Sequence, residues 1–243
     1  MKLQVCTLDV SPLLEDTLFM KYKNCIAKDR AKKAEQYKAK ADQARCIGAG
    51  ILLAMAYEQF QKENGESAGA GSLFACCVTA YELTADGIKN TEKKELKTCD
   101  IVTENELCKL TKALPIEQIG EKGKPFFAEG PFFNISHAGD MVVVAMASEN
   151  VGVDIERKRS CKESVMNRCF TEDEIDKVKE SKEQKDKAFT EIWTKKEAVA
   201  KLTGIGLADI WDKKKPEGVA VHSIWLNESY VISICMADLS FVI

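Results

Sequence analysis

The sequence predicts an α+β fold, because strand-like and helix-like patterns occupy different parts of the chain. Residues 1–10 alternate as a strand does, and residues 29–64 carry a long helical pattern. Two apolar runs near the C-terminus, residues 219–226 and 230–236, predict a closing hairpin.

Composition and charge exclude several classes of protein. The chain has 243 residues, and 35 Lys and Arg against 38 Asp and Glu give a net charge of −3, so we expect no partnership with nucleic acid or membranes. The longest apolar runs, such as Met141 to Ala147, are too short to cross a bilayer, and the first residues lack a signal-peptide pattern. With 2 histidines and no CxxC pair, a zinc site is not expected, and the 10 cysteines predict reduced thiols in a cytoplasmic protein.

The N-terminal part predicts one long basic helix followed by a segment without a clear pattern. Ile47, Ile51 and Met55 track one side of the helix, and Gly65 follows as a stop signal. Residues 65–112 begin with small polar residues and give no consistent pattern, so we interpret them as a possible insertion. The basic residues of the helical stretch are Lys28, Arg30, Lys32, Lys33, Lys38, Lys40 and Arg45.

The C-terminal part gives stronger local signals. A turn at Gly123-Lys124-Pro125 precedes a short strand at 132–135. Residues 141–147 and 151–155 predict two strands of an antiparallel hairpin. A capping box at Thr171 and Glu174 starts one helix near Glu172, and a second helix over 185–203 ends at Gly204.

Two carboxylates follow one another on a predicted strand. In Gly152-Val153-Asp154-Ile155-Glu156, alternation places Asp154 and Glu156 on one face while Val153 and Ile155 face the core. Two acids on one face repel each other unless a cation neutralises them. Taken alone, the motif also fits an ordinary strand end that faces solvent.

A second motif lies on the predicted helix over 185–203. Trp193, Glu197 and Lys201 are spaced by four residues and therefore lie along one line of the helix surface. Taken alone, Glu197 and Lys201 also fit a surface ion pair. Together with Asp154 and Glu156, they predict a Mg²⁺ site beside a phosphate. Such a site is suited to a transfer reaction at a phosphorus atom.

A polar segment containing Ser136 and His137 precedes the strand at 141–147. Both side chains are candidates for phosphate contact. A Ser-His hydrolase is weakly supported because no paired acid is evident, and a lone His is more often structural.

Four segments in this order resemble the signatures of Sfp-type 4′-phosphopantetheinyl transferases, over roughly residues 120–206. The basic stretch from Arg30 to Arg45 resembles the N-terminal half of that family more loosely. The four segments are Gly123-Lys124-Pro125, Phe133 to Asp140, Gly152 to Glu156, and Trp193 to Ala198 with Lys201 and Gly204.

The resemblance implies two similar α+β halves related by a pseudo-twofold axis, residues 1–118 and 119–243, with coenzyme A bound between them. It implies that Asp154, Glu156 and Glu197 hold Mg²⁺ and that Lys201 contacts the pyrophosphate. It also implies a nucleotide pocket. The residues implied to line that pocket are Gly123, Lys124, Pro125, Ser136 and His137, with Arg30, Lys33 and Arg45 at the 3′-phosphate.

The implied reaction moves the 4′-phosphopantetheine group of coenzyme A to a serine of an acyl or peptidyl carrier protein, with Glu197 as the base. Asp154, Glu197 and Lys201 are the catalytic residues in this interpretation. We expect a monomer, and we expect Phe170 and the helix from Glu172 to dock the carrier. Alternatives are a non-catalytic module that binds coenzyme A or a carrier, and a Mg²⁺ phosphotransferase acting on nucleotides. The absence of a GxxxxGK[ST] loop disfavours the second alternative.

Overall fold

The structure is a computed structural model that describes residues 2–62, 78–83, 88–90, 101–121, 123–204 and 218–237. The strands are β1 (Leu3–Asp9), β2 (Val78–Leu83), β3 (Ile88–Asn90), β4 (Ile101–Val102), β5 (Glu117–Ile119), β6 (Pro125–Phe127), β7 (Phe132–Ala138), β8 (Met141–Ala147), β9 (Val151–Arg157), β10 (Val219–Leu226) and β11 (Tyr230–Ala237). The helices are α1 (Asp16–Lys23), α2 (Lys28–Gln36), α3 (Lys40–Lys62), α4 (Glu104–Ala113), α5 (Glu163–Cys169), α6 (Glu172–Glu180) and α7 (Lys185–Thr203), with short 3-10 turns η1 (Ser11–Leu14) and η4 (Lys182–Gln184). The predicted α+β class is confirmed.

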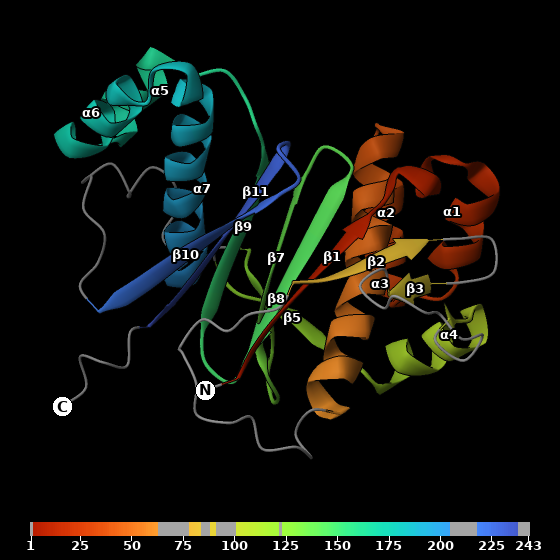
Figure 1. The fold of residues 1–243 in the computed structure, drawn as a ribbon. Helices are drawn as coiled ribbons and strands as arrows, with labels where there is room; N and C mark the ends of the chain where they lie inside the picture. The colour runs from red at the N-terminus through yellow and green to blue at the C-terminus, as the bar shows by residue number, and fades with distance from the viewer. Residues whose placement is uncertain are drawn as a thin grey trace.

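Two sheets form the centre of the molecule (Figure 1). The larger has the order β4-β3-β2-β1-β8-β7, and the smaller has the order β10-β11-β9. Strand β1 runs parallel to β2 and antiparallel to β8. A third, two-stranded sheet pairs β5 with β6.

Each sheet is covered by one long helix. Helix α3 packs on β1 and β8 of the larger sheet, and helix α7 packs on β9 and β11 of the smaller one (Figure 1). A separate apolar cluster fills the space between the sheets, where Val143 and Ala145 of β8 meet Val153 and Ile155 of β9. Because the apolar residues of β9 face the other sheet, the opposite face of β9 is turned toward α7. That face carries Asp154 and Glu156.

The long helical pattern of residues 29–64 is divided into two helices, so the prediction of one continuous helix is wrong. The backbone of Tyr37 is extended and ends α2, and α3 begins at Lys40. The break allows α2 to fold back onto α3 at Gly50, where a Cβ atom would come within 2.7 Å of Arg30 Cδ. Packing between the two helices therefore overrides a helical pattern that is continuous in sequence.

The predicted hairpin of residues 141–147 and 151–155 is also wrong, although both strands occur. Strand β8 pairs with β1 and β7, whereas β9 pairs with β11. The turn between β8 and β9 carries the chain from one sheet to the other. Their apolar residues then meet face to face in the core instead of edge to edge.

The other C-terminal predictions are confirmed. Thr171 and Glu174 form a capping box at the start of α6. Helix α7 ends at Gly204, whose φ of 67° lies in the left-handed region that favours glycine. Strands β10 and β11 form the closing hairpin around residues 227–229.

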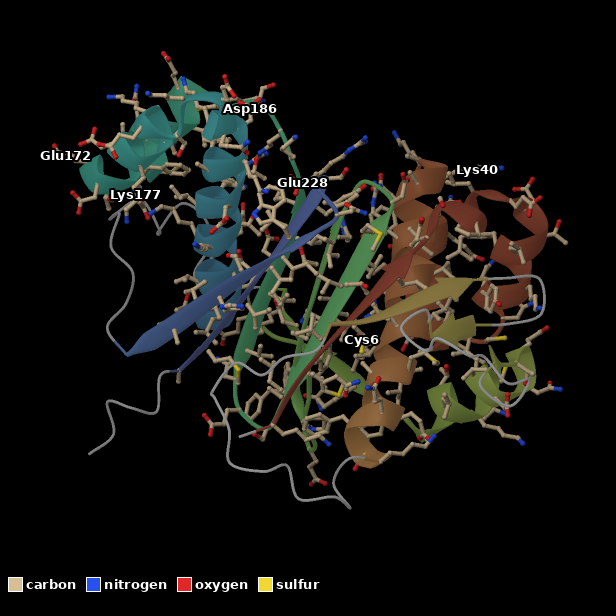
Figure 2. The ribbon with its side chains drawn as sticks, viewed as in Figure 1. Cys6, Lys40, Glu172, Lys177, Asp186 and Glu228 are labelled. Carbon is tan, nitrogen blue, oxygen red and sulfur yellow. The ribbon has the colours of Figure 1, made fainter. Side chains whose placement is uncertain are left out.

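Phe170 does not form a docking surface, because its ring is fully buried. It stacks on Phe189 of α7 with 5.4 Å between ring centroids. Helix α6 presents Glu172 and Lys177 on its outer side, away from the sheets (Figure 2). The prediction that Phe170 contacts a carrier is therefore wrong, since an apolar contact residue has to reach solvent.

The proposed division at residue 118 stays a prediction. The larger sheet contains strands from both sides of that position, because β1 and β2 lie beside β8 and β7. The suggested insertion at 65–112 lies partly outside the described residues, namely at 65–77, 84–87 and 91–100. Its described strands β2, β3 and β4 continue the larger sheet.

No helix in the described ranges is both long and apolar enough to cross a membrane. The cysteines of those ranges are free thiols, at positions 6, 25, 46, 108, 161, 169 and 235. Cys76, Cys77 and Cys99 lie outside the described residues.

Candidate functional site

The site begins on β9, where the acidic side chains lie on one face of the strand and the core residues on the other, as predicted. Val153 and Ile155 are buried in the cluster between the sheets. Asp154 is only 5% exposed and Glu156 is half-buried, and both belong to the opposite face of the strand. A carboxylate as buried as Asp154 needs a cation or hydrogen-bond donors, because burial disfavours its charge.

Gly152 allows helix α7 to approach this strand closely. A Cβ atom at position 152 would lie 2.2 Å from the carbonyl oxygen of Ala198 and 2.5 Å from the backbone nitrogen of Leu202. Since both atoms belong to the helix backbone, any side chain here would push α7 away from β9. The glycine thereby sets the distance between the acids of β9 and Glu197 and Lys201 of α7.

Lys201, Asp154 and Ser136 form a compact hydrogen-bonded triangle. The Lys201 ammonium donates to Asp154 Oδ1 at 2.7 Å and to Ser136 Oγ at 2.7 Å. Ser136 Oγ donates to the same Asp154 oxygen at 2.8 Å. The structure therefore brings together one predicted residue each from β7, β9 and α7.

The acidic residues around this triangle repel one another. Burial raises the pKa of Glu197 to about 7, and the charges of Asp154 and Glu156 contribute to the rise. The pKa of Glu156 is also raised, first by burial, although Arg159 opposes the shift. An added cation would relieve this repulsion.

The donor set fits Mg²⁺ on two observations. Asp154 Oδ2 is buried and has no hydrogen-bond partner, and the charges of Glu156 and Glu197 interact with Asp154. Within the described ranges, no three acidic, histidine or cysteine side chains are already gathered as a metal cluster. Mg²⁺ keeps water and substrate phosphates in its shell, so its carboxylate ligands do not have to enclose the ion in advance.

A cavity of about 540 Å³ lies on the other side of β7. Its walls come from α2, α3, the β5–β6 hairpin and β7. Six of the residues predicted for nucleotide binding line it: Arg30, Lys33, Arg45, Gly123, Pro125 and His137.

Two acids hold the arginines of this cavity in place. Glu117 accepts hydrogen bonds from Nε and Nη2 of Arg30, which joins α2 to the β5–β6 hairpin. Asp42 accepts from Arg45 Nη2, while Arg45 Nη1 donates to the Gly139 carbonyl oxygen at 2.9 Å. Glu117 and Asp42 were not predicted, because no sequence pattern near them indicates which arginine each one meets.

His137 follows Ser136 on β7, and its side chain lines the basic cavity. The pKa of His137 is lowered by loss of surrounding water and by the positive charges of Arg45 and Lys201. Ser136, the residue before it, bonds to Asp154 and Lys201, so adjacent residues of β7 face the acidic cluster and the cavity.

Lys124 lies apart from this cavity. Its ammonium donates to Asn150 Oδ1 at 2.9 Å and to the Val151 carbonyl oxygen at 3.1 Å. It lines a different pocket, of about 550 Å³, beside the end of α7. The positive φ of 81° at Gly123 turns the chain so that Gly123 and Pro125 line the cavity and the Lys124 side chain does not.

Part of the chain that carries this site is similar to known proteins. Residues 150–235 match the model of the 4′-phosphopantetheinyl transferase superfamily. The predicted resemblance to these transferases is thereby confirmed over the part of the chain that carries β9, α7 and the closing hairpin.

Individual relatives carry the same name. A 4′-phosphopantetheinyl transferase of Bacillus pumilus is 39% identical over 103 residues, which are 40% of this chain and 44% of that protein. One from Salmonella typhimurium is 41% identical over 97 residues, 37% of this chain and 50% of that protein. One from Aneurinibacillus migulanus is 33% identical over 132 residues, 47% of this chain and 55% of that protein. The matched part of this chain thus spans about half the length of these relatives.

Proposed function

We propose that this protein transfers the 4′-phosphopantetheine group of coenzyme A to a serine of an acyl or peptidyl carrier protein. The observation that carries the proposal is that adjacent residues of β7 face a basic cavity and an acidic cluster. His137 lines the cavity that holds Arg30, Lys33 and Arg45. Ser136 beside it bonds to Asp154 and Lys201 of the cluster. A nucleotide with several phosphates and an adjacent metal requires this distribution of charge. The named relatives support it.

Coenzyme A would bind with its nucleotide in the cavity of about 540 Å³, which lies within the usual size range of ligand pockets. Arg30, Lys33 and Arg45 would meet the 3′-phosphate. Gly123 and Pro125 would line the nucleotide pocket with their backbone. Lys124 would contribute its backbone alone, because its ammonium donates to Asn150 outside the cavity.

Asp154, Glu156 and Glu197 would hold Mg²⁺. The ion supplies neutralisation of charge on the pyrophosphate when it is bound. Lys201 would contact the same pyrophosphate, because its ammonium already reaches the carboxylate of Asp154 and the hydroxyl of Ser136.

The reaction is a displacement at phosphorus. The carrier serine oxygen forms a bond to the β-phosphorus of coenzyme A, and the bond from that phosphorus to the bridging oxygen breaks. Adenosine 3′,5′-bisphosphate leaves with the bonding electrons, stabilised by Lys201. Glu197 accepts the serine proton, directly or through water.

The proposal is tested by intact-protein mass spectrometry of an apo carrier protein incubated with the enzyme, coenzyme A and Mg²⁺. We expect the carrier to gain one phosphopantetheine mass and to lose that gain when EDTA is added. If a folded protein binds coenzyme A but modifies neither acyl nor peptidyl carriers, the chain is a binding module and the proposed transfer is wrong.

Replacing Asp154 by Ala is expected to abolish Mg²⁺-dependent transfer while the protein stays folded. The carboxylate provides the buried, unpartnered oxygen at the centre of the acidic cluster. Glu104→Ala, which removes an exposed acid on α4, is the control and should keep full activity. Near-normal transfer by the Asp154 variant would contradict the metal assignment. Circular dichroism shows whether both variants fold.

We also propose that the protein acts in the cytoplasm as a monomer, without a nucleic-acid or membrane partner. One chain supplies every residue assigned above, and the net charge of −3 provides no general attraction to polyanions. Light scattering coupled to size-exclusion chromatography tests the monomer, for which we expect a mass near 27.0 kDa.

A further inference from the structure

Strand β9 is fastened to β7 by side chains at the junction of the two sheets. On one side, β9 makes main-chain pairs with β11. On the side of β7, the Val153 N–H donates to Asn134 Oδ1 at 2.9 Å, and the Ile155 N–H donates to Ser136 Oγ at 3.3 Å. Asn134 and Ser136 are each 4% exposed. Two side chains of β7 thus satisfy backbone donors that a neighbouring strand would otherwise satisfy.

The two bonded amides lie on either side of Asp154. The Ile155 N–H belongs to the peptide unit that directly follows Asp154, and the Val153 N–H belongs to the unit one residue before the peptide that precedes Asp154. Holding both groups restricts the backbone on the two sides of Asp154, and hence the direction of its side chain. Ser136 also donates to Asp154 Oδ1 at 2.8 Å. Asp154 is therefore held through its own carboxylate and through the backbone of both of its neighbours.

Asn134 is chemically suited to this position. Its carbonyl oxygen is a neutral acceptor, so it satisfies the Val153 N–H without adding a negative charge beside Asp154, Glu156 and Glu197. A leucine would have a similar shape but would leave the buried N–H without a partner, which is costly. The amide therefore combines hydrogen bonding with the absence of charge.

We propose that Asn134 is a positioning residue for the metal-binding strand: its hydrogen bond to the Val153 amide keeps Asp154 aimed at the divalent cation. The inference rests on the proposed function, because it assumes a cation at Asp154. Residues that orient metal ligands commonly change metal affinity by roughly 10–100-fold when they are replaced.

The test compares Asn134→Leu with Phe133→Leu. Phe133 is the adjacent residue of β7, and its side chain packs in the core cluster beside α3, whereas Val153 and Ile155 belong to the cluster between the sheets. Its replacement therefore perturbs the fold on the face of β7 opposite Asn134. Mn²⁺ affinity, measured without coenzyme A by electron paramagnetic resonance of free Mn²⁺, is the main readout. We expect about tenfold weaker binding for Asn134→Leu and wild-type binding for Phe133→Leu.

Amide hydrogen exchange provides a readout that requires no metal. Exchange at Val153 is expected to accelerate in Asn134→Leu and to stay slow in Phe133→Leu. Asn134→Thr, which retains an acceptor oxygen, covers the case in which the leucine variant does not fold. We expect its Mn²⁺ affinity to lie between those of the leucine variant and the wild type.

Two negative results have different meanings. If the wild type binds Mn²⁺ better than Asp154→Ala does, and the Asn134 variants match the wild type, the positioning role is overturned and the metal site stands. If the wild type binds Mn²⁺ no better than Asp154→Ala, the proposed metal site is overturned, and the positioning role with it.

Discussion

At the scale of single residues, the two oxygens of Asp154 have different surroundings. Oδ1 accepts from Ser136 and Lys201, whereas Oδ2 is buried without a partner. Lys201 therefore acts as an internal counter-ion at one oxygen. A divalent cation at the other oxygen has to share the carboxylate with this ammonium or displace it.

Replacing Lys201 by Met should lower the free energy of unfolding by about 1–3 kcal/mol, because a buried carboxylate loses its partner. Lys201 is itself 29% exposed, so the loss should fall below that of a fully buried pair. Added Mg²⁺ should recover more stability in the variant than in the wild type, since the cation no longer competes with an ammonium. Thermal unfolding with and without Mg²⁺ measures both effects. Equal recovery in the two proteins would show that the ammonium and the cation do not compete.

Glu197 predicts a pH dependence of stability. Its pKa in the folded protein is about 7, above the ordinary value of 4.5. Between these values the folded chain holds a proton that the unfolded chain has lost. The free energy of unfolding therefore falls as pH rises through this window, and the unfavourable contribution of the buried, ionised carboxylate is fully present above pH 7.

Glu197→Gln should remove this contribution and should also abolish transfer. Without divalent ions, we expect the melting temperature of the variant to exceed that of the wild type by a few degrees at pH 8, and the difference to shrink toward pH 5. Scanning calorimetry at the two pH values measures it. A difference that grows toward pH 5 would contradict the raised pKa.

At the scale of elements, the contact between α7 and β9 determines whether the site forms. Gly152→Ala should destabilise the protein by about 1–3 kcal/mol, the usual cost of overpacking. It should also reduce transfer strongly, because α7 has to move away with Glu197 and Lys201. Gly48→Ala is the matched control, since its Cβ would meet the Val10 side chain at 2.2 Å in the other half of the molecule.

The comparison is made on transfer at a temperature where both glycine variants are folded, with stability followed by urea unfolding. Gly48→Ala should retain transfer in proportion to its folded fraction, and Gly152→Ala should fall far below it. Similar transfer by the two variants would mean that the α7–β9 spacing does not set the position of Glu197 and Lys201.

Elements with strong local signals were predictable from the sequence, whereas their partners were not. Helix α7 runs from Lys185 to Thr203 as predicted, because a single glycine, Gly204, ends an amphipathic pattern. The edge partners of β8 and β9 depend on strands distant in sequence, namely β1 and β11, and no local pattern carries that information. For the same reason, the importance of Gly152 became evident only with the helix in place.

The candidate site was predictable to a similar degree. Asp154 and Glu156 share a face because alternation is a local property of a strand. The positions of Lys124 and Phe170 were not predictable, since a turn with positive φ directs the first and a tertiary core buries the second. The arginine partners Glu117 and Asp42 likewise depend on how α2, α3 and the hairpin meet.

At the scale of the whole molecule, the basic cavity and the acidic cluster lie on different layers. The cavity belongs to α2, α3 and the β5–β6 hairpin, while the cluster belongs to β9 and α7. A ligand that spans both should tie the layers together. Binding of coenzyme A and Mg²⁺ should therefore stabilise regions that are far apart in sequence.

Hydrogen exchange followed by mass spectrometry tests this coupling. With coenzyme A and EDTA, we expect slower exchange in α2 and the start of α3, because the phosphates engage Arg30, Lys33 and Arg45. Adding Mg²⁺ should extend the protection to α7, because Glu197 then contacts the ion and Lys201 contacts the pyrophosphate. Asp154→Ala should keep the first effect and lose the second. Protection of α7 by Mg²⁺ that persists in Asp154→Ala would place the ion elsewhere, and the link between the two layers would then depend on the pyrophosphate and Lys201 alone.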